Sequence, residues 1–154
     1  MTSKGRIYVR AHAALRLFAE DLDPSAVTRA LELPPDHVHR KGDLRIGRTK
    51  TGTVQVYAPY TAGMWSMSSE PWVTSPRLQA HIQWVLDQME PKADALALIL
   101  ATGVSADVFC YSLGRSVSPP SVPRSSRALL RELGLSLEID HYELSEDSQP
   151  QESV

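Results

Sequence analysis

A run of alternating residues near the N-terminus constrains the fold more than any other feature of this sequence. Apolar side chains fill every second position over 7–17, at Ile7, Val9, Ala11, Ala13, Leu15 and Leu17. Side chains of a strand point to its two faces in turn, whereas those of a helix repeat every 3.6 residues. The run therefore predicts a long β-strand with one face buried.

The other face of this strand carries Tyr8, Arg10, His12, Arg16 and Phe18. Opposite charges on neighbouring strands stabilise a sheet. The segment that closes the fold carries Glu138 and Asp140. We therefore expect these two acids to pair with the basic side chains of the first strand.

Helix signals follow the strand and alternate with further strand-like segments. Asp23-Pro24 is typical of a helix start, because Asp accepts unpaired backbone N–H groups and Pro lacks one. Pro34-Pro35 predicts the end of this helix. Ser75-Pro76 opens a second helix, whose inward stripe is Leu78, Ile82, Val85, Leu86 and Met89. The other predicted elements are strands over 53–57 and 64–69 paired as a hairpin across 58–63, helices over 93–101 and 126–133, and strands over 104–111 and 135–142.

Strands and helices interleaved in this way predict an α+β fold. We expect a two-layer sandwich in which helices pack on one face of a mixed or antiparallel sheet, related to the split β-α-β folds of the ferredoxin-like kind. The length of 154 residues fits one domain, over 1–143. Residues 144–154 are polar and acidic, which predicts a disordered tail.

Composition excludes some functional classes. The net charge of −2 argues against a dedicated nucleic-acid binder. No apolar run reaches the roughly 18 residues of a membrane span, and no apolar stretch follows the first charges, as a secretory signal requires. Cys110 is the only cysteine, so it has no partner for a disulfide within the chain. We therefore expect a cytoplasmic protein that does not enter a membrane.

Basic and aromatic residues in the middle of the chain form the candidate site. Arginine binds an anion through two parallel N–H groups, and Gly42 lets backbone N–H groups approach one. Tryptophan and arginine are enriched in protein interfaces. We therefore expect one polar, aromatic binding surface formed by Arg40, Lys41, Gly42, Asp43, Trp65, Ser66, Ser69, His81, Trp84 and Asp140.

The same residues also have plainer structural interpretations. The basic segment over 40–50 is equally typical of a solvated loop in which Asp43 caps a turn. Large aromatic residues such as the tryptophans commonly cover the core of a domain. His37 and His39 lie on one side of an extended segment, but without a third ligand at a recognised spacing they predict no metal site.

Three residue types of a hydrolytic triad are present, as Ser69 (or Ser68), His81 and Asp140. The sequence lacks the Gly-x-Ser-x-Gly turn that exposes a nucleophilic serine. A small hydrolase or transferase with His81 as its base is therefore an alternative rather than the main hypothesis.

Five motifs resemble the bacterial domain-of-unknown-function 4279 family in their order and spacing. They are Glu20-Asp21-Leu22-Asp23-Pro24, Arg40-Lys41-Gly42-Asp43, Gly63-Met64-Trp65-Ser66-Met67-Ser68-Ser69, His81-Ile82, and the segment from Leu133-Gly134-Leu135 to Asp140-His141-Tyr142. One departure is Glu32, where the family tends to have a glycine-containing turn before the proline. The resemblance implies a compact α+β fold in a soluble bacterial protein, and it implies no activity.

From these observations we expect a non-enzymatic binding module that needs no cofactor. Its basic-aromatic surface would hold a protein partner or a small anionic ligand. Two alternatives stay open, namely the enzyme with His81 as base and a weak nucleic-acid binder that uses the basic loop.

Overall fold

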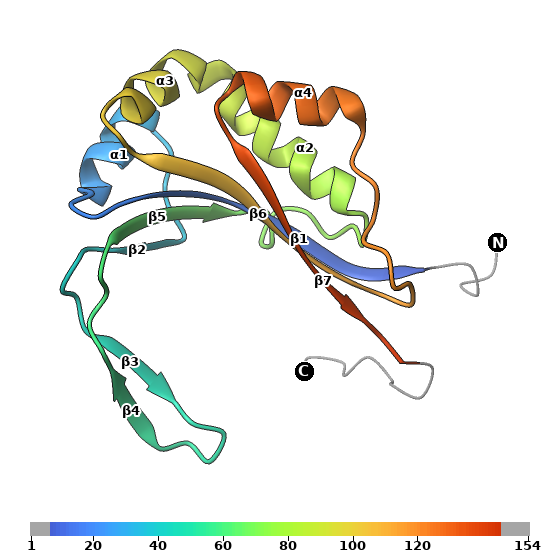
Figure 1. The fold of residues 1–154 in the computed structure, drawn as a ribbon, viewed down its shortest axis with the longest axis horizontal. Helices are drawn as coiled ribbons and strands as arrows, with labels where there is room; N and C mark the ends of the chain where they lie inside the picture. Colours follow the sequence, from blue (N-terminus) through green and yellow to red (C-terminus); the bar gives the residue numbers. More distant parts are fainter. Residues whose placement is uncertain (1–6, 146–154) are drawn as a thin grey trace.

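The computed structural model describes residues 7–145. Among them a five-stranded sheet forms one layer, and the helices form a second layer over one face of that sheet (Figure 1). The elements in chain order are β1 (Tyr8–Ala19), α1 (Pro24–Leu31), β2 (His37–His39), β3 (Arg45–Arg48), β4 (Val54–Tyr57), β5 (Gly63–Ser68), α2 (Leu78–Met89), a 3-10 turn (Glu90–Lys92), α3 (Ala93–Ala101), β6 (Ser105–Gly114), α4 (Arg124–Glu132) and β7 (Ser136–Glu143).

The strand order of the sheet is β2-β5-β1-β6-β7. β1 pairs antiparallel with both β5 and β6, while β6 and β7 pair in parallel. β5 and β6 therefore run parallel to each other on either side of β1, and the chain between them passes through α2 and α3. This is a split β-α-β arrangement, and the predicted α+β sandwich with a mixed sheet is confirmed.

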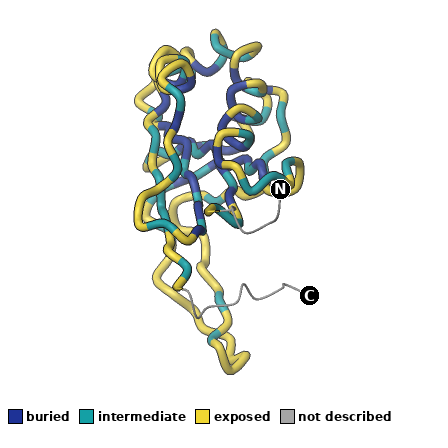
Figure 2. The backbone as a smooth tube through the Cα atoms, turned by 90° about the vertical axis from the view of Figure 1, so that its right-hand side faces the viewer, coloured by how far each residue is buried: buried dark blue, intermediate teal, exposed yellow. Residues whose placement is uncertain are grey.

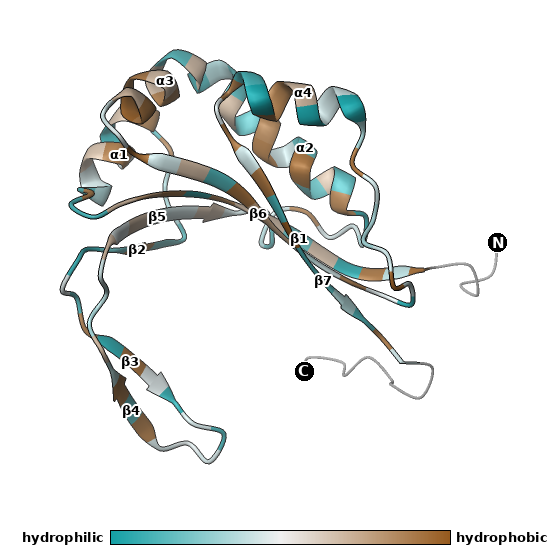
Figure 3. Ribbon diagram, in the orientation of Figure 1, coloured by the Kyte–Doolittle hydropathy of each residue, from teal (hydrophilic) through white to brown (hydrophobic). Residues whose placement is uncertain are grey.

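The core lies between the sheet and the helices, where the alternation of β1 places it. Ala13, Leu15 and Leu17 are fully buried, and the whole predicted inward stripe of α2 is buried as well. The tube in Figure 2 is dark blue where these layers meet, and Figure 3 shows apolar stretches on the helices above the sheet. Ile7 is exposed, because the helices do not extend over this end of β1 (Figure 1).

Both ends of α1 have a local cause. The Asp23 carboxylate accepts the backbone N–H of Ser25, so the helix begins at Pro24 as predicted. It ends at Leu31, before the two prolines, because Glu32 turns into the left-handed region with φ of 55°. Among the described residues Glu32 is the only non-glycine residue with a positive φ.

Replacing Glu32 with glycine is expected to stabilise the protein by about 0.5–1 kcal/mol, because glycine has no Cβ to strain the left-handed conformation. The matched control is Glu32→Ala, which removes the same carboxylate but keeps the Cβ. Urea denaturation of the two variants measures the difference. A glycine variant no more stable than the alanine variant would show that position 32 carries no strain.

The segment over 37–69 differs most from the sequence-based expectation. Strands 53–57 and 64–69 do not pair with each other. Instead β4 pairs with β3, and β5 pairs with β1 and β2. The reason is burial, since β5 places Trp65 and Met67 in the core, whereas β4 is exposed along its length. The β3–β4 hairpin projects from the sheet on the side away from the helices (Figure 1).

The start of α2 and the start of the C-terminal tail also differ from the prediction. α2 begins at Leu78 with Arg77 as its N-cap, and so not at Ser75-Pro76. Of the predicted tail, residues 146–154 lie outside the described residues, while the Leu144 N–H donates to the carbonyl of Gly114 and extends the contact of β7 with β6.

Candidate functional site

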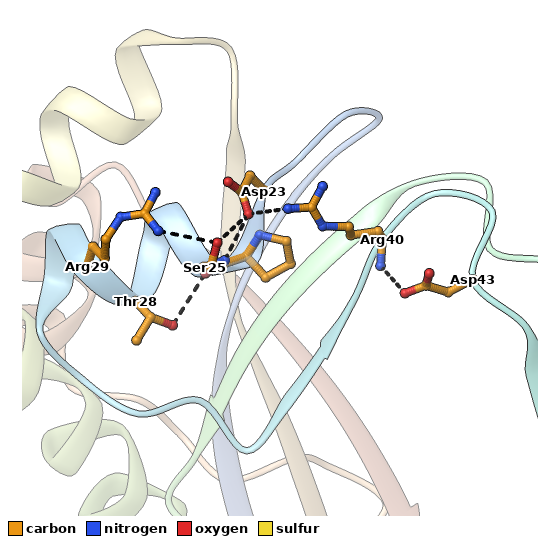
Figure 4. Close-up of polar contacts among 7 residues, drawn as sticks. Asp23, Ser25, Thr28, Arg29, Arg40 and Asp43 are labelled. Atoms are coloured by element: carbon orange, nitrogen blue, oxygen red, sulfur yellow. Dashed lines mark hydrogen bonds and ion pairs between the residues drawn. The ribbon is translucent and has the colours of Figure 1, made fainter.

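The basic motif after β2 contacts the start of α1 (Figure 4). The Arg40 guanidinium donates to Asp23 Oδ1 at 2.6 Å. The Lys41 ammonium pairs with Glu20. Hydrogen bonds from Ser25, together with the Arg40 charge, lower the pKa of Asp23 below its ordinary value. Both cations are thus neutralised by carboxylates of the same chain. An anion that binds them would compete with Asp23 and Glu20.

The other half of this motif holds the base of the β3–β4 hairpin. Asp43 accepts the backbone N–H of Arg40 at 2.7 Å, which closes the turn. Gly42 has a φ of 88°, a conformation that favours glycine, and its N–H donates to the carbonyl of Tyr60 at 2.8 Å. The Tyr60 N–H in turn donates to the carbonyl of Asp43 at 3.1 Å. The four residues Arg40–Asp43 therefore fix the hairpin to the body of the protein.

The Gly63–Ser69 motif lies inside the protein. Trp65 is fully buried, and its indole N–H donates to the Thr28 hydroxyl of α1 at 3.0 Å. Ser66 and Ser69 are buried too. The expectation of an exposed surface that includes Trp65, Ser66 and Ser69 is therefore corrected. The apolar indole gains more from burial between β5 and α1 than from any contact with solvent.

Ser69 and His81 form a hydrogen-bonded pair that substrate cannot reach. Their Oγ and Nδ1 atoms are 2.7 Å apart, and Ser69 Oγ also accepts the Ala13 N–H at 2.9 Å. His81 Nε2 lies 2.7 Å from the Ser75 carbonyl oxygen, which only accepts, so Nε2 carries the proton and Nδ1 accepts from Ser69. Ser69 and His81 are 0% and 1% exposed. The pair therefore ties α2 to β1 and to the loop after β5.

The open face of the sheet, which the helices do not cover, is polar. Asp107 of β6 binds Arg16 of β1 with both carboxylate oxygens, at 2.8 and 2.6 Å. These hydrogen bonds raise the pKa of Arg16, and its guanidinium lies 4.5 Å from the centroid of the Phe109 ring. β6 separates β1 from β7. The expected ion pair of β1 with Glu138 or Asp140 is therefore corrected, because Asp107 on the intervening strand binds Arg16. Glu138 acts on Arg16 only through its charge, which also raises the pKa of Arg16.

Asp140 lies on this open face and forms no triad with His81, which is packed on the helix side. The Tyr142 hydroxyl donates to Asp140 Oδ2 at 2.8 Å, and this bond raises the pKa of Tyr142. Nearby, the His12 ring stacks on Tyr111 with the centroids 4.9 Å apart. Burial lowers the pKa of His12. Aromatic rings and carboxylates thus share the end of the open face.

The β3–β4 hairpin exposes two different faces. Ile46, Val54 and Val56 lie on one face and are 64%, 54% and 65% exposed. On the other face Arg45 lies opposite Tyr57, and its guanidinium is 5.1 Å from the centroid of the Tyr60 ring. The hairpin thus has an exposed apolar strip on one face, and on the other an arginine close to two tyrosine rings.

The charge of the hairpin is uncompensated. Arg45, Arg48 and Lys50 lie in a stretch, residues 44–69, that contains no acid. Within residues 7–145 the ion pairs involve other basic residues, namely Arg10, Arg16, Arg40 and Lys41. Sequence reasoning found the basic excess but did not separate the neutralised cations from the unpaired ones. The alternation of Val54 and Val56 was the available signal for the hairpin.

The two histidine side chains of β2 lie against each other and against a tyrosine ring. His39 stacks on Tyr60 with centroids 3.5 Å apart, and the His37 ring lies 5.2 Å from that of His39. In the described part of the chain no three His, Cys, Asp or Glu residues gather in a group that could hold a metal ion. Burial lowers the pKa of His39.

Two of the hollows beside the helices are lined mainly by apolar side chains. The larger, about 790 Å³, runs between α1 and α3 and is lined mainly by aliphatic side chains such as Ala26, Ala30, Leu98 and Ile99. The smaller, about 310 Å³, is lined by Trp84, the remaining predicted site residue, which is half-buried. Of the two tryptophans in the predicted binding surface, Trp65 is therefore in the core and only Trp84 lines a hollow.

Comparison with known proteins is consistent with the motifs. The chain has no match among curated proteins or solved structures. No helix within residues 7–145 has both the length and the apolar character needed to cross a membrane. The family described as a domain of unknown function, DUF4279, matches residues 9–144, a range that contains all five motifs. The chain therefore belongs to the DUF4279 family.

Proposed function

We propose that the protein is a non-enzymatic interaction module whose docking element is the β3–β4 hairpin. The partner is a protein that offers an apolar recess surrounded by acidic residues. The observation that carries the proposal is the strip of Ile46, Val54 and Val56, each more than half exposed on an element with no helix over it (Figures 1 and 2).

The apolar strip favours a binding role on energetic grounds. A two-stranded hairpin without a core is only marginally stable in water. Contiguous apolar patches on soluble proteins commonly mark interaction sites. Burying one aliphatic side chain of this size contributes about 1.5–3 kcal/mol. A partner that covers all three side chains would both gain affinity and stabilise the hairpin.

The charge of the hairpin favours an acidic partner. Arg45, Arg48 and Lys50 attract carboxylates during encounter, and such steering raises the association rate at low salt. The same charges repel a second hairpin, which argues against pairing between two copies. A small anion is the weaker candidate, because Arg40 and Lys41 already bind Asp23 and Glu20.

The proposed compartment is the cytoplasm of a bacterium. Cys110 lies in the core of β6, and burial raises the pKa of its thiol to about 12. The bacterial setting rests on the family resemblance. A reducing compartment suits a chain with one buried thiol and no disulfide.

Capture from a lysate of the native cells tests this proposal. Ile46→Ser/Val56→Ser is expected to lower recovery of the partner at least about tenfold, because two of the three buried apolar contacts are lost. Arg48→Ser/Lys50→Ser is expected to weaken recovery and to reduce its dependence on salt. Leu98→Ser is the matched control, since it removes an exposed apolar side chain from α3.

Equal recovery of the same protein by wild type and by both hairpin variants would overturn the proposal. So would recovery that disappears after nuclease treatment, since the hairpin would then contact nucleic acid. Thermal unfolding of each variant establishes that the body of the protein is intact.

A further inference from the structure

The smaller hollow is lined by two indole rings, several apolar side chains and one carboxylate. It lies between α2, β5 and the loop after α1, and its volume of about 310 Å³ suits a small ligand. Trp72, Trp84 and Met67 line it together with proline and leucine side chains, and Asp36 is its only charged lining residue. This hollow is separate from the hairpin, so an inference about it does not depend on the proposed docking role.

Hydrogen bonds to the backbone hold the two loops that line this hollow. Trp72 is 68% exposed, yet its backbone N–H donates to the carbonyl of Ser69 at 2.9 Å, which fixes the loop. Asp36 Oδ2 accepts the Ser68 N–H at 2.6 Å, and the Asp36 N–H donates to the carbonyl of Ser66 at 2.8 Å. The carboxylate is thus positioned by one oxygen. Within residues 7–145, Asp36 Oδ1 accepts no hydrogen bond.

Indole rings and a carboxylate together attract a positive charge. The face of an aromatic ring is negative, and the indole of tryptophan binds cations best. Asp36 adds direct Coulomb attraction, and no lysine, arginine or histidine lines the hollow to oppose it. A neutral or anionic ligand would use only part of this wall. The charge preference of the hollow is therefore for a cation.

The apolar part of the wall restricts which cation fits. A primary ammonium carries three N–H donors, and each one loses hydration unless it meets an acceptor. Among the side chains that line the hollow, only those of Asp36 and Gln88 supply acceptor oxygens. N-methyl groups instead spread the charge over carbon and pack against Trp72, Trp84 and Met67. We propose that this hollow binds an organic cation of the methylated-ammonium class.

Titration with choline tests the proposal, followed by the indole N–H signals in a proton–nitrogen NMR spectrum. The signals of Trp72 and Trp84 are expected to shift. The signal of Trp65 is the internal control, because its N–H is buried and bonded to Thr28. The neutral isostere of choline, in which carbon replaces the nitrogen, is expected to bind at least about threefold more weakly.

Two variants locate the site. Trp72→Ala and Asp36→Asn are each expected to weaken choline binding about 3- to 30-fold. Asparagine retains an oxygen that accepts the Ser68 N–H, so this change removes charge and preserves shape. Asp87→Asn is the matched control, since it removes an exposed carboxylate of α2 that does not line the hollow.

The inference is supported only if choline shifts both indole signals, binds more tightly than its neutral isostere, and binds more weakly to both variants. Absence of any choline-induced shift would overturn it. Equal binding of the neutral isostere would also overturn it, because the hollow would then select apolar shape alone. Shifts caused by a proline-rich peptide and not by choline would assign the hollow to peptide recognition instead, and unchanged affinity in Asp36→Asn would remove the carboxylate from the site.

Discussion

Replacing Trp65 with alanine is expected to lower the free energy of unfolding by about 3–5 kcal/mol. Within residues 7–145, Trp65 has the largest fully buried side chain, and it packs from β5 against α1. The substitution leaves a cavity in the core and removes the donor to Thr28. Because domains of this size are stable by only about 5–15 kcal/mol, the loss is a large fraction of the total. Urea denaturation measures it.

Trp72→Ala is the matched control, because it removes the same side chain from an exposed position. Its effect on stability is expected to stay within about 0.5 kcal/mol. A Trp65→Ala protein as stable as Trp72→Ala would contradict the buried placement of the Gly63–Ser69 motif. It would also restore the hypothesis that this motif forms a binding surface.

Replacing Ser69 with alanine is expected to cost about 2–4 kcal/mol of stability, although only one oxygen atom is removed. The Ser69 hydroxyl accepts the Ala13 N–H and donates to His81 Nδ1, and all three groups are buried. Alanine leaves a donor on β1 and an acceptor on α2 without a partner. Burying an unsatisfied polar group costs more than the net gain of a typical hydrogen bond.

Ser68→Ala is the control for Ser69→Ala. The Ser68 hydroxyl accepts only the N–H of Glu70 on an exposed turn, so the loss is expected to be about 0.5 kcal/mol or less. Chemical denaturation of both variants compares the two hydroxyls directly. Equal stability would mean that Ser69 and His81 do not form a structural pair, and the hydrolase hypothesis would then regain support.

Local patterns in the sequence predicted much of the fold. The alternation of Ala13, Leu15 and Leu17 identified the buried face of β1, because period two depends only on strand geometry. The Asp23-Pro24 start of α1 was equally local, since a helix cap involves neighbouring residues. Patterns of this kind determine which segments form helices or strands.

Pairing between distant segments was not predictable in the same way. β3, β4 and β5 are all short, so their lengths do not determine which strands pair. β5 pairs with β1 and β2, which places its Trp65 in the core, and β4 pairs with β3 instead. The partner of Arg16 depends on strand order, which places Asp107 of β6 beside β1. Opposite charge alone had favoured Glu138 and Asp140 of β7, one strand farther away, where Glu138 acts on Arg16 through its charge without forming an ion pair. Charge complementarity therefore indicates a partner only when strand order is known.

The candidate site was only partly predictable because residue type does not reveal burial. Histidine and tryptophan occur both on protein surfaces and in cores, and here His81 and Trp65 are both buried. Trp84 does line a hollow, but its neighbours there, Trp72 and Asp36, come from separate loops. Their proximity follows from the path of the chain between α1 and α2.

Four of the five motifs that resemble the family contact one another. Arg40–Asp43 binds the segment over 20–24 through two ion pairs. A Cβ at Gly63 would lie 2.8 Å from the carbonyl oxygen of Leu22, so the third motif packs against the first. The Ser69–His81 hydrogen bond joins the third motif to the fourth. These motifs therefore build the body of the protein and anchor the hairpin for which we propose the docking role.

Photo-crosslinking in the native cell tests the docking role of the hairpin most directly. A photoreactive residue is placed at Val56 on the hairpin, at Leu98 on α3, or at Tyr142 on the open face, all of which are at least half exposed. The account predicts one protein adduct that forms from position 56 and from neither other position. An adduct that forms from position 98 or 142 and not from position 56 would contradict it.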